Sequence, residues 1–184
     1  MVLFVNACVR GESRTKRLAD AVLERIGDEV TELRLWEMEM PAVDEAFIAR
    51  RDAAIEKNDF SDPVFGLARQ FAAADTIVIA APYWDLSFPA SLKQYIEQVS
   101  VVGISFTYSE TGIPKGMCAA GKLYYVTTSG GRNVPAEFGA GYIEALARGL
   151  YGIGDFEAVS AEGLDIYGED AEAILAERIR LVKQ

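Results

Sequence analysis

Four basic residues stand close together near the start of the chain: Arg10, Arg14, Lys16 and Arg17. The only acidic residue between them is Glu12, although the whole chain carries a formal charge of −10. A helical pattern begins in this segment, and the positive end of a helix dipole disfavours cations unless an anion binds among them. The cluster therefore predicts an anion site, and phosphate is the obvious candidate. The alternative is that the basic side chains are solvated and a hydroxyl residue merely caps the helix.

The same segment contains neutral groups that suit a phosphate. Gly11 allows a tight turn, while Ser13 and Thr15 can donate hydroxyl hydrogens or cap the helix beside free main-chain amides. The spacing matches neither the GxxxxGK[ST] phosphate loop nor the GxGxxG fingerprint. A nucleoside triphosphate hydrolase and an ordinary dinucleotide-binding protein are therefore disfavoured.

Two later loops also carry unusual residues. Residues 82–89 place the rings of Tyr83 and Trp84 and the carboxyl group of Asp85 between two prolines, and a loop held in this way can present flat rings and main-chain amides to a planar ligand. Residues 127–133 contain small residues around Gly130 that permit close approach of the backbone. Packing of the sheet edge and an ordinary turn are the respective alternatives. Together with the anion segment, the loops predict a flat heterocycle with a phosphate tail, a shape that flavin mononucleotide (FMN) has.

The composition removes several classes of chemistry. The chain contains no histidine, which excludes Ser-His and Cys-His nucleophiles and imidazole zinc sites. Cys8 and Cys118 form no CxxC pair, so we expect free thiols in a reducing compartment and no metal site. The acidic balance disfavours nucleic acid and anionic membranes as partners. Without a signal peptide or an apolar run of about 18 residues, a cytoplasmic protein is expected.

Hydrophobic patterning predicts alternating strands and helices. Continuous apolar runs, typical of parallel strands buried on both faces, occur at residues 2–5, 76–82 and 123–128, with weaker strands at 29–35 and 155–161. Helical patterns occupy residues 13–26, 43–57, 63–74, 89–100, 135–149 and 169–182, with Pro89 in a first helical turn. Residues 101–121 form the one long irregular stretch, and connections of that length are usually functional.

This alternation predicts one α/β domain over residues 1–184. Right-handed crossovers give a doubly wound parallel sheet of five strands in the order 2-1-3-4-5, with helices on both faces. In such a sheet ligands bind beyond the carboxyl ends of the strands, near the switch between strands 1 and 3. The three loops described above all leave strands at that edge, so we expect them to meet.

Three segments carry recognisable motifs: AAPYW continuing to FPASLK in residues 80–93, GISFTYSETG in residues 103–112, and TSGG in residues 128–131. In this order, and over nearly the whole chain, they resemble the FMN-dependent azoreductases and NAD(P)H:quinone oxidoreductases of the flavodoxin-like fold. The resemblance implies a homodimer with FMN at each of two interface sites. It also implies two-electron reduction of quinones or of azo and nitro aromatics, with NADH or NADPH as electron donor.

The resemblance further implies which residues form the site. The phosphate would be held by Ser13, Arg14 and Thr15, with Cys8 beside them, and the isoalloxazine would be lined by Pro82, Tyr83, Trp84, Asp85 and Leu86. The pyrimidine side would be bordered by Thr128, Ser129, Gly130 and Gly131. Phe106 and Tyr108 match a segment near the substrate face of the flavin, where a partner subunit can contribute, although Phe-x-Tyr at strand spacing is commonly simple packing.

Two residues depart from the family's pattern. Family members commonly carry Ser at the position of Cys8, so a weak thiol donor replaces a hydroxyl. They commonly carry Asn at the position of Asp85, whose charge near the isoalloxazine would disfavour the anionic reduced flavin and lower its potential. The alternatives are that this carboxyl group is protonated, turned to solvent or paired with a cation.

The resulting hypothesis is ping-pong hydride transfer, in which a nicotinamide reduces the flavin and departs before the oxidised aromatic binds. We assign no catalytic side chain, because the cofactor carries the chemistry. A flavodoxin-type electron carrier, which the acidity suits, and an FMN-binding protein without turnover remain alternatives. A signalling receiver domain is disfavoured because Asn6, followed by basic residues, stands where that class requires clustered aspartates.

Overall fold

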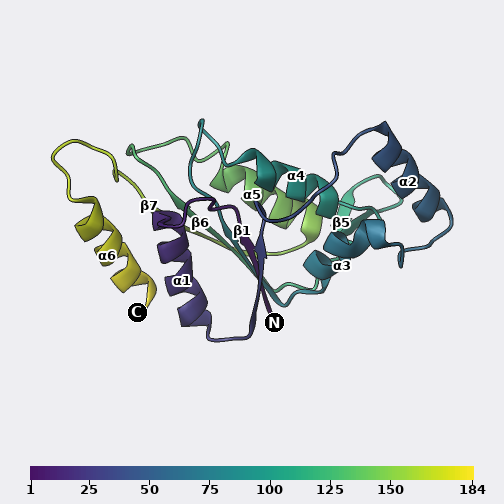
Figure 1. Cartoon of the computed structure of the whole chain (residues 1–184). Coiled ribbons are helices and arrows are strands. Elements are labelled where there is room, and N and C mark those ends of the chain that lie inside the picture. The colour runs from purple at the N-terminus through teal and green to yellow at the C-terminus, as the bar shows by residue number, and fades with distance from the viewer.

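The computed structural model describes residues 1–184, and a five-stranded parallel sheet forms its centre (Figure 1). The strands are β1 (Val2–Asn6), β2 (Val30–Arg34), β3 (Thr76–Ala80), β6 (Lys122–Thr128) and β7 (Asp155–Ala161). Their spatial order is β2-β1-β3-β6-β7, and every neighbouring pair is parallel. The predicted order 2-1-3-4-5 is confirmed, because β6 and β7 are the fourth and fifth strands of this sheet.

Helices cover both faces of the sheet (Figure 1). One face packs against α1 (Arg14–Ile26) and α6 (Ala171–Val182), and the other packs against α3 (Gly66–Ala73), α4 (Ala90–Val99) and α5 (Ala140–Leu146). Alternation along the strands assigns each side chain to a face: Phe4 and Val78 pack with α1, while Leu3 and Ile77 pack on the opposite side. Because both faces are covered, the central strands carry apolar side chains on both faces over most of their length.

The β2 edge of the molecule is less deeply buried. The side chains of β2 are half-buried or exposed, which explains why its apolar run is weak in the sequence. Beyond this edge α2 (Glu45–Glu56) packs against the short 3₁₀ turn Pro63–Phe65, with Ala54 and Phe65 buried in a small separate cluster. No helix is both long and apolar enough to cross a membrane.

Residues 101–121 are more regular than predicted, because they contain the antiparallel hairpin β4 (Phe106–Tyr108) and β5 (Pro114–Gly116). The chain returns from this hairpin at the amino-terminal edge of the sheet. There the main-chain amide of Ala119 donates to the Ala72 carbonyl, and that of Gly121 donates to the Asp75 carbonyl just before β3. The hairpin is therefore anchored at the edge opposite to the carboxyl ends of the strands.

Two helix starts also differ from the predictions. Helix α4 begins one residue after Pro89, which is the N-cap residue rather than part of the first turn. The helix predicted over residues 135–149 begins only at Ala140, because hydroxyl groups from the loop after β3 bind the preceding carbonyls. Tyr83 donates to the Pro135 carbonyl at 3.0 Å, and Ser87 donates to the Phe138 carbonyl at 2.5 Å.

Candidate functional site

A cavity of about 440 Å³ opens at the carboxyl edge of the sheet. Its volume lies within the roughly 300–1,000 Å³ usual for small-molecule sites. Four loops line it: Arg10, Glu12, Ser13 and Arg14 follow β1; Pro82, Tyr83 and Trp84 follow β3; Thr128, Ser129 and Gly130 follow β6; Leu164 and Asp165 follow β7. The three loops selected from the sequence therefore meet, and a fourth loop that the sequence did not single out joins them.

The doubly wound topology creates this cavity. The chain leaves β1 through α1 on one face of the sheet and enters β3 from α3 on the other face. The paired strands β1 and β3 end side by side at Asn6 and Ala80, and the loops that follow them diverge toward opposite faces. A crevice is left at this switch point, which is where doubly wound sheets bind their ligands.

The bend between β1 and α1 presents unbonded main-chain amides to this crevice. From Val9 to Thr15 no main-chain N–H finds an acceptor within the chain. Ser13 caps α1, since its Oγ accepts a hydrogen bond from the Lys16 amide at 3.2 Å. The cap that the sequence offered as an alternative therefore coexists with a group of amides suited to an anion.

The basic side chains of the bend divide into two groups. Lys16 pairs with Asp20 and Arg17 pairs with Glu172, and neither lines the cavity. For these two residues the alternative interpretation, that the basic side chains are solvated, is therefore correct. Arg14 and Arg10 do line the cavity. Arg10, which the site prediction omitted although the basic cluster includes it, is in no ion pair and is free for a ligand.

Two of the predicted phosphate residues turn their side chains away from the cavity. Thr15 is 1% exposed, and its hydroxyl lies 2.6 Å from that of Thr128, which joins α1 to β6. Only the main-chain amide of Thr15 is left for a ligand. Cys8 is also buried, with its thiol 3.7 Å from the Ala80 carbonyl. Burial raises the pKa of the Cys8 thiol to about 11, so the thiol stays protonated near neutral pH.

The loop after β3 forms a tight turn at its centre. Trp84 and Ser87 exchange main-chain hydrogen bonds of 3.0 and 2.7 Å, and Asp85 and Leu86 between them have φ angles of +52° and +65°. This is a type I′ arrangement, which costs a leucine conformational energy and leaves both central amides unbonded. Strain of this kind indicates a functional constraint on the turn.

Asp85 and Leu86 do not line the first cavity. They border a neighbouring, more apolar cavity of about 550 Å³ together with Phe138 and Tyr142. Asp85 is in no ion pair; Lys93, which lines the same cavity, pairs with Glu97. The two cavities lie on either side of the same turn, since Trp84 lines one and Asp85 the other.

The glycine loop after β6 is held closely against the loop after β7. Ser129 Oγ donates to the Gly131 carbonyl at 2.9 Å, and Gly131 itself stays outside the cavity lining. A Cβ atom at Gly130 would lie 2.5 Å from a carboxylate oxygen of Asp165. Gly130 thus permits a close approach that a larger residue would obstruct, as its type suggested.

Phe106 and Tyr108 are not brought to the cavity of their own chain. They stand on β4, in the hairpin anchored at the opposite edge of the sheet, with ring centroids 5.5 Å apart in an edge-to-face arrangement. Phe106 is buried, whereas Tyr108 is exposed. Their predicted contact with a substrate therefore depends on a partner subunit, as the resemblance allowed.

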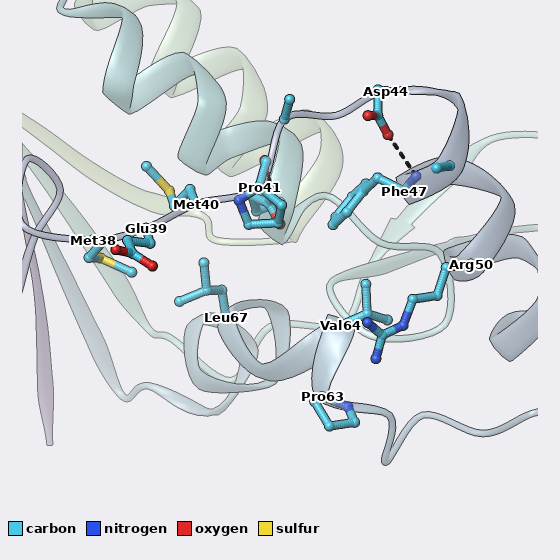
Figure 2. Close-up of a pocket in the computed structure, with 13 residues that line it drawn as sticks. Met38, Glu39, Met40, Pro41, Asp44, Phe47, Arg50, Pro63, Val64 and Leu67 are labelled. Atoms are coloured by element: carbon cyan, nitrogen blue, oxygen red, sulfur yellow. Dashed lines mark hydrogen bonds between the residues drawn. The ribbon is translucent and has the colours of Figure 1, made fainter.

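A larger cavity of about 750 Å³ lies elsewhere, between the segment after β2, α2 and the start of α3 (Figure 2). Met40, Phe47 and Leu67 make much of its wall apolar, and the side chain of Asp44 accepts a hydrogen bond from the Phe47 amide at 2.9 Å. Its one basic residue, Arg50, is paired with Asp62 at 2.7 Å. The smaller cavity combines unbonded amides, a free guanidinium group and aromatic residues, so it is the candidate site.

A doubly wound parallel sheet with a cavity and a bend of unbonded amides at its switch point defines a protein of the flavodoxin-like class. Comparison with known proteins agrees: a family model described as flavodoxin-like fold matches residues 1–184, and the chain belongs to this family.

Named relatives match over the full length. The chain is 35% identical over 192 residues to an FMN-dependent NADH:quinone oxidoreductase of Clostridium beijerinckii, covering 100% of this chain and 96% of the relative. It is 36% identical over 195 residues to FMN-dependent NADH:quinone oxidoreductase 2 of Clostridium acetobutylicum, with the same coverage. Among solved structures, an azoreductase from Bacillus anthracis superimposes with a TM-score of 0.85 at 26% identity, covering 99% of this chain and 96% of that one. The resemblance stated from the motifs is confirmed.

Proposed function

We propose that this protein is an FMN-dependent NADH:quinone oxidoreductase that also accepts azo or nitro aromatics. The single observation that carries the proposal is the cavity at the switch point, where Arg10, Ser13 and Arg14 of a bend with unbonded main-chain amides line the same space as Tyr83 and Trp84. The relatives named above, two of them quinone oxidoreductases and one an azoreductase, support the same activity.

The residues present fit FMN. The phosphate would be held by the amides of the bend, the Ser13 hydroxyl and the guanidinium groups of Arg10 and Arg14. The isoalloxazine would lie along Tyr83 and Trp84, within reach of the free amides of the type I′ turn. The loop from Thr128 to Gly130 would border the ring on its other side.

Bound FMN supplies the redox chemistry, because its ring can take a hydride from a nicotinamide and return two electrons to an oxidised aromatic. The chain contributes position, a partly dry surface and local charge. The rigid turn at Asp85 and Leu86 presents its amides without reorganisation, since its main chain is already strained into place. No side chain needs to act as an acid or base, which agrees with the absence of histidine.

NADH added without oxygen to the purified yellow protein should bleach the flavin absorption band, and a quinone added afterwards should restore it. Recovery of the oxidised spectrum after the nicotinamide has been removed would support the ping-pong order. Steady NADH oxidation with a quinone separates the enzyme from an electron carrier, which should show little turnover. A colourless protein that takes up no added FMN would contradict the proposal.

We also propose that the chain forms a homodimer in which the hairpin of one subunit reaches the cavity of the other. Several large apolar side chains stay exposed in and around the hairpin: Val102, Tyr108, Ile113 and Met117. An apolar group of this kind usually marks an interface. A partner subunit would also bring Phe106 and Tyr108 to a substrate, which their own chain does not do.

Light scattering should give twice the 20.1 kDa mass of one chain. Replacing Ile113 and Met117 by glutamate should shift the protein to monomers and lower quinone turnover, because charged groups would be buried at the interface. Leu181→Glu is the matched control, since Leu181 is an exposed apolar residue of α6 on the other side of the sheet. A monomeric parent protein would refute the dimer.

A further inference from the structure

The carboxylate of Asp165 lies at the anion end of the candidate cavity. Arg14 Nη1 donates to Asp165 Oδ1 at 2.8 Å and to the Leu164 carbonyl at 3.0 Å, and all three residues line the cavity. α1 packs over β3 and β6, so Arg14 at its first turn lies beside the loop that follows the neighbouring strand β7. One of the two guanidinium groups in the cavity is thus already bound to an acidic group of the chain.

The position of this carboxylate is built into the fold. Three successive main-chain amides, those of Gly163, Leu164 and Asp165, donate to carbonyls of the glycine loop at 2.8, 3.1 and 3.1 Å. The absence of a side chain at Gly130 leaves the space that the carboxylate occupies. The backbone of Asp165 is therefore fixed beside the cavity, while its side chain is 69% exposed and open to a ligand or solvent.

The charges that line the cavity determine how strongly the Asp165 carboxylate affects the binding of a phosphate. The lining contains two basic residues, Arg10 and Arg14, and two acidic residues, Glu12 and Asp165. The other two basic residues of the bend, Lys16 and Arg17, lie outside the cavity and are paired with carboxylates. Without a ligand the lining is electrically balanced, so a phosphate gains a full attraction from Arg14 only when Asp165 releases it.

We propose that Asp165 is an internal competitor for the cofactor phosphate. It holds Arg14 in the free protein and lowers the affinity for FMN, while leaving the affinity for a phosphate-free flavin unchanged. The Arg14–Asp165 pair is exposed and therefore weak, so a phosphate can take the place of Asp165 on Arg14. If the carboxylate then stays beside the phosphate, the two negative charges repel each other. Asp165 would thereby set how readily the chain loses its cofactor. This inference rests on the proposed function.

The opposite role would be that Asp165 orients Arg14 toward the phosphate. The two roles differ in sign, because loss of the carboxylate strengthens FMN binding in the first case and weakens it in the second. The phosphate-free compound riboflavin separates both roles from a general change in the cavity. A competitor for the phosphate leaves riboflavin binding unaffected.

The test compares the FMN-free parent protein with D165N, measuring the dissociation constants of FMN and riboflavin by quenching of flavin fluorescence. D165N should bind FMN up to about fivefold more tightly, equivalent to about 1 kcal/mol, and riboflavin within about twofold of the parent. E172Q is the matched control. It also removes one negative charge, and it breaks the ion pair with Arg17, which is on the same helix as Arg14 but outside the cavity. It should change neither constant.

Equal or weaker binding of FMN by D165N would overturn the competitor role, and so would an equal gain for riboflavin. These results would leave the proposed function intact if the parent protein binds FMN and is reduced by NADH. A parent protein that binds no FMN would overturn the proposed function and this inference together.

Discussion

Replacing Arg10 and Arg14 together by glutamine should weaken FMN binding more than about 100-fold, because two charge-assisted hydrogen bonds to a phosphate contribute about 1.5–3 kcal/mol each. The loss should be larger still in this chain, since Glu12 and Asp165 would stay in the cavity without a balancing cation. Riboflavin affinity should change little. Fluorescence quenching with the two flavins measures both effects.

Arg17→Gln is the matched control for this double variant. Arg17 belongs to the same basic cluster and the same helix, but it pairs with Glu172 and stays outside the cavity. Its loss should leave FMN binding within about twofold, because an exposed charge this far from the ligand is screened by salt. If the double variant held FMN as tightly as the parent, the bend would not be the phosphate site.

Gly116→Ala should destabilise the fold by about 3 kcal/mol, which urea or thermal unfolding would measure. A Cβ atom at Gly116 would lie 2.1 Å from the main-chain nitrogen of Gly152 and 2.1 Å from the carbonyl carbon of Tyr151. Both atoms belong to the main chain, at the end of the π turn Ala147–Tyr151, and neither can rotate away. The hairpin that carries Phe106 and Tyr108 is held against the body of the chain by this close approach.

Gly121→Ala is the control for this prediction. Gly121 ends the same connection, but a Cβ atom there meets nothing within 4 Å and its φ is not in the left-handed region. The change should alter the free energy of unfolding by less than about 0.5 kcal/mol. Equal stability of the Gly116 and Gly121 variants would show that the hairpin can move away from Tyr151 at little cost.

The central strands and the location of the cavity were predictable because they depend on short-range patterns. Strands β1, β3 and β6 read as continuous apolar runs since both of their faces are buried. Their order then follows from chain connectivity, and the switch point follows from the order. The loops after these three strands could therefore be assigned to one edge before any contact was known.

The hairpin and the delayed start of α5 were not predictable in the same way. β4 and β5 have three residues each, too few for a periodic pattern to register. Residues 135–139 carry a helical pattern, yet Tyr83 and Ser87 bind the carbonyls of Pro135 and Phe138 from a loop some fifty residues earlier. Tertiary hydrogen bonds outweighed local propensity there.

The sequence by itself determined the alternating elements, the family and three of the four loops that build the site, because each leaves a local signature of periodicity or motif. Only the tertiary structure decided how the charges are shared: which arginines face the cavity, that Thr15 turns inward to Thr128, and that Asp165 meets Arg14. Asp165 lies 151 positions from Arg14, and no local pattern encodes a contact over that separation. Such pairings depend on where the folded loops place each side chain.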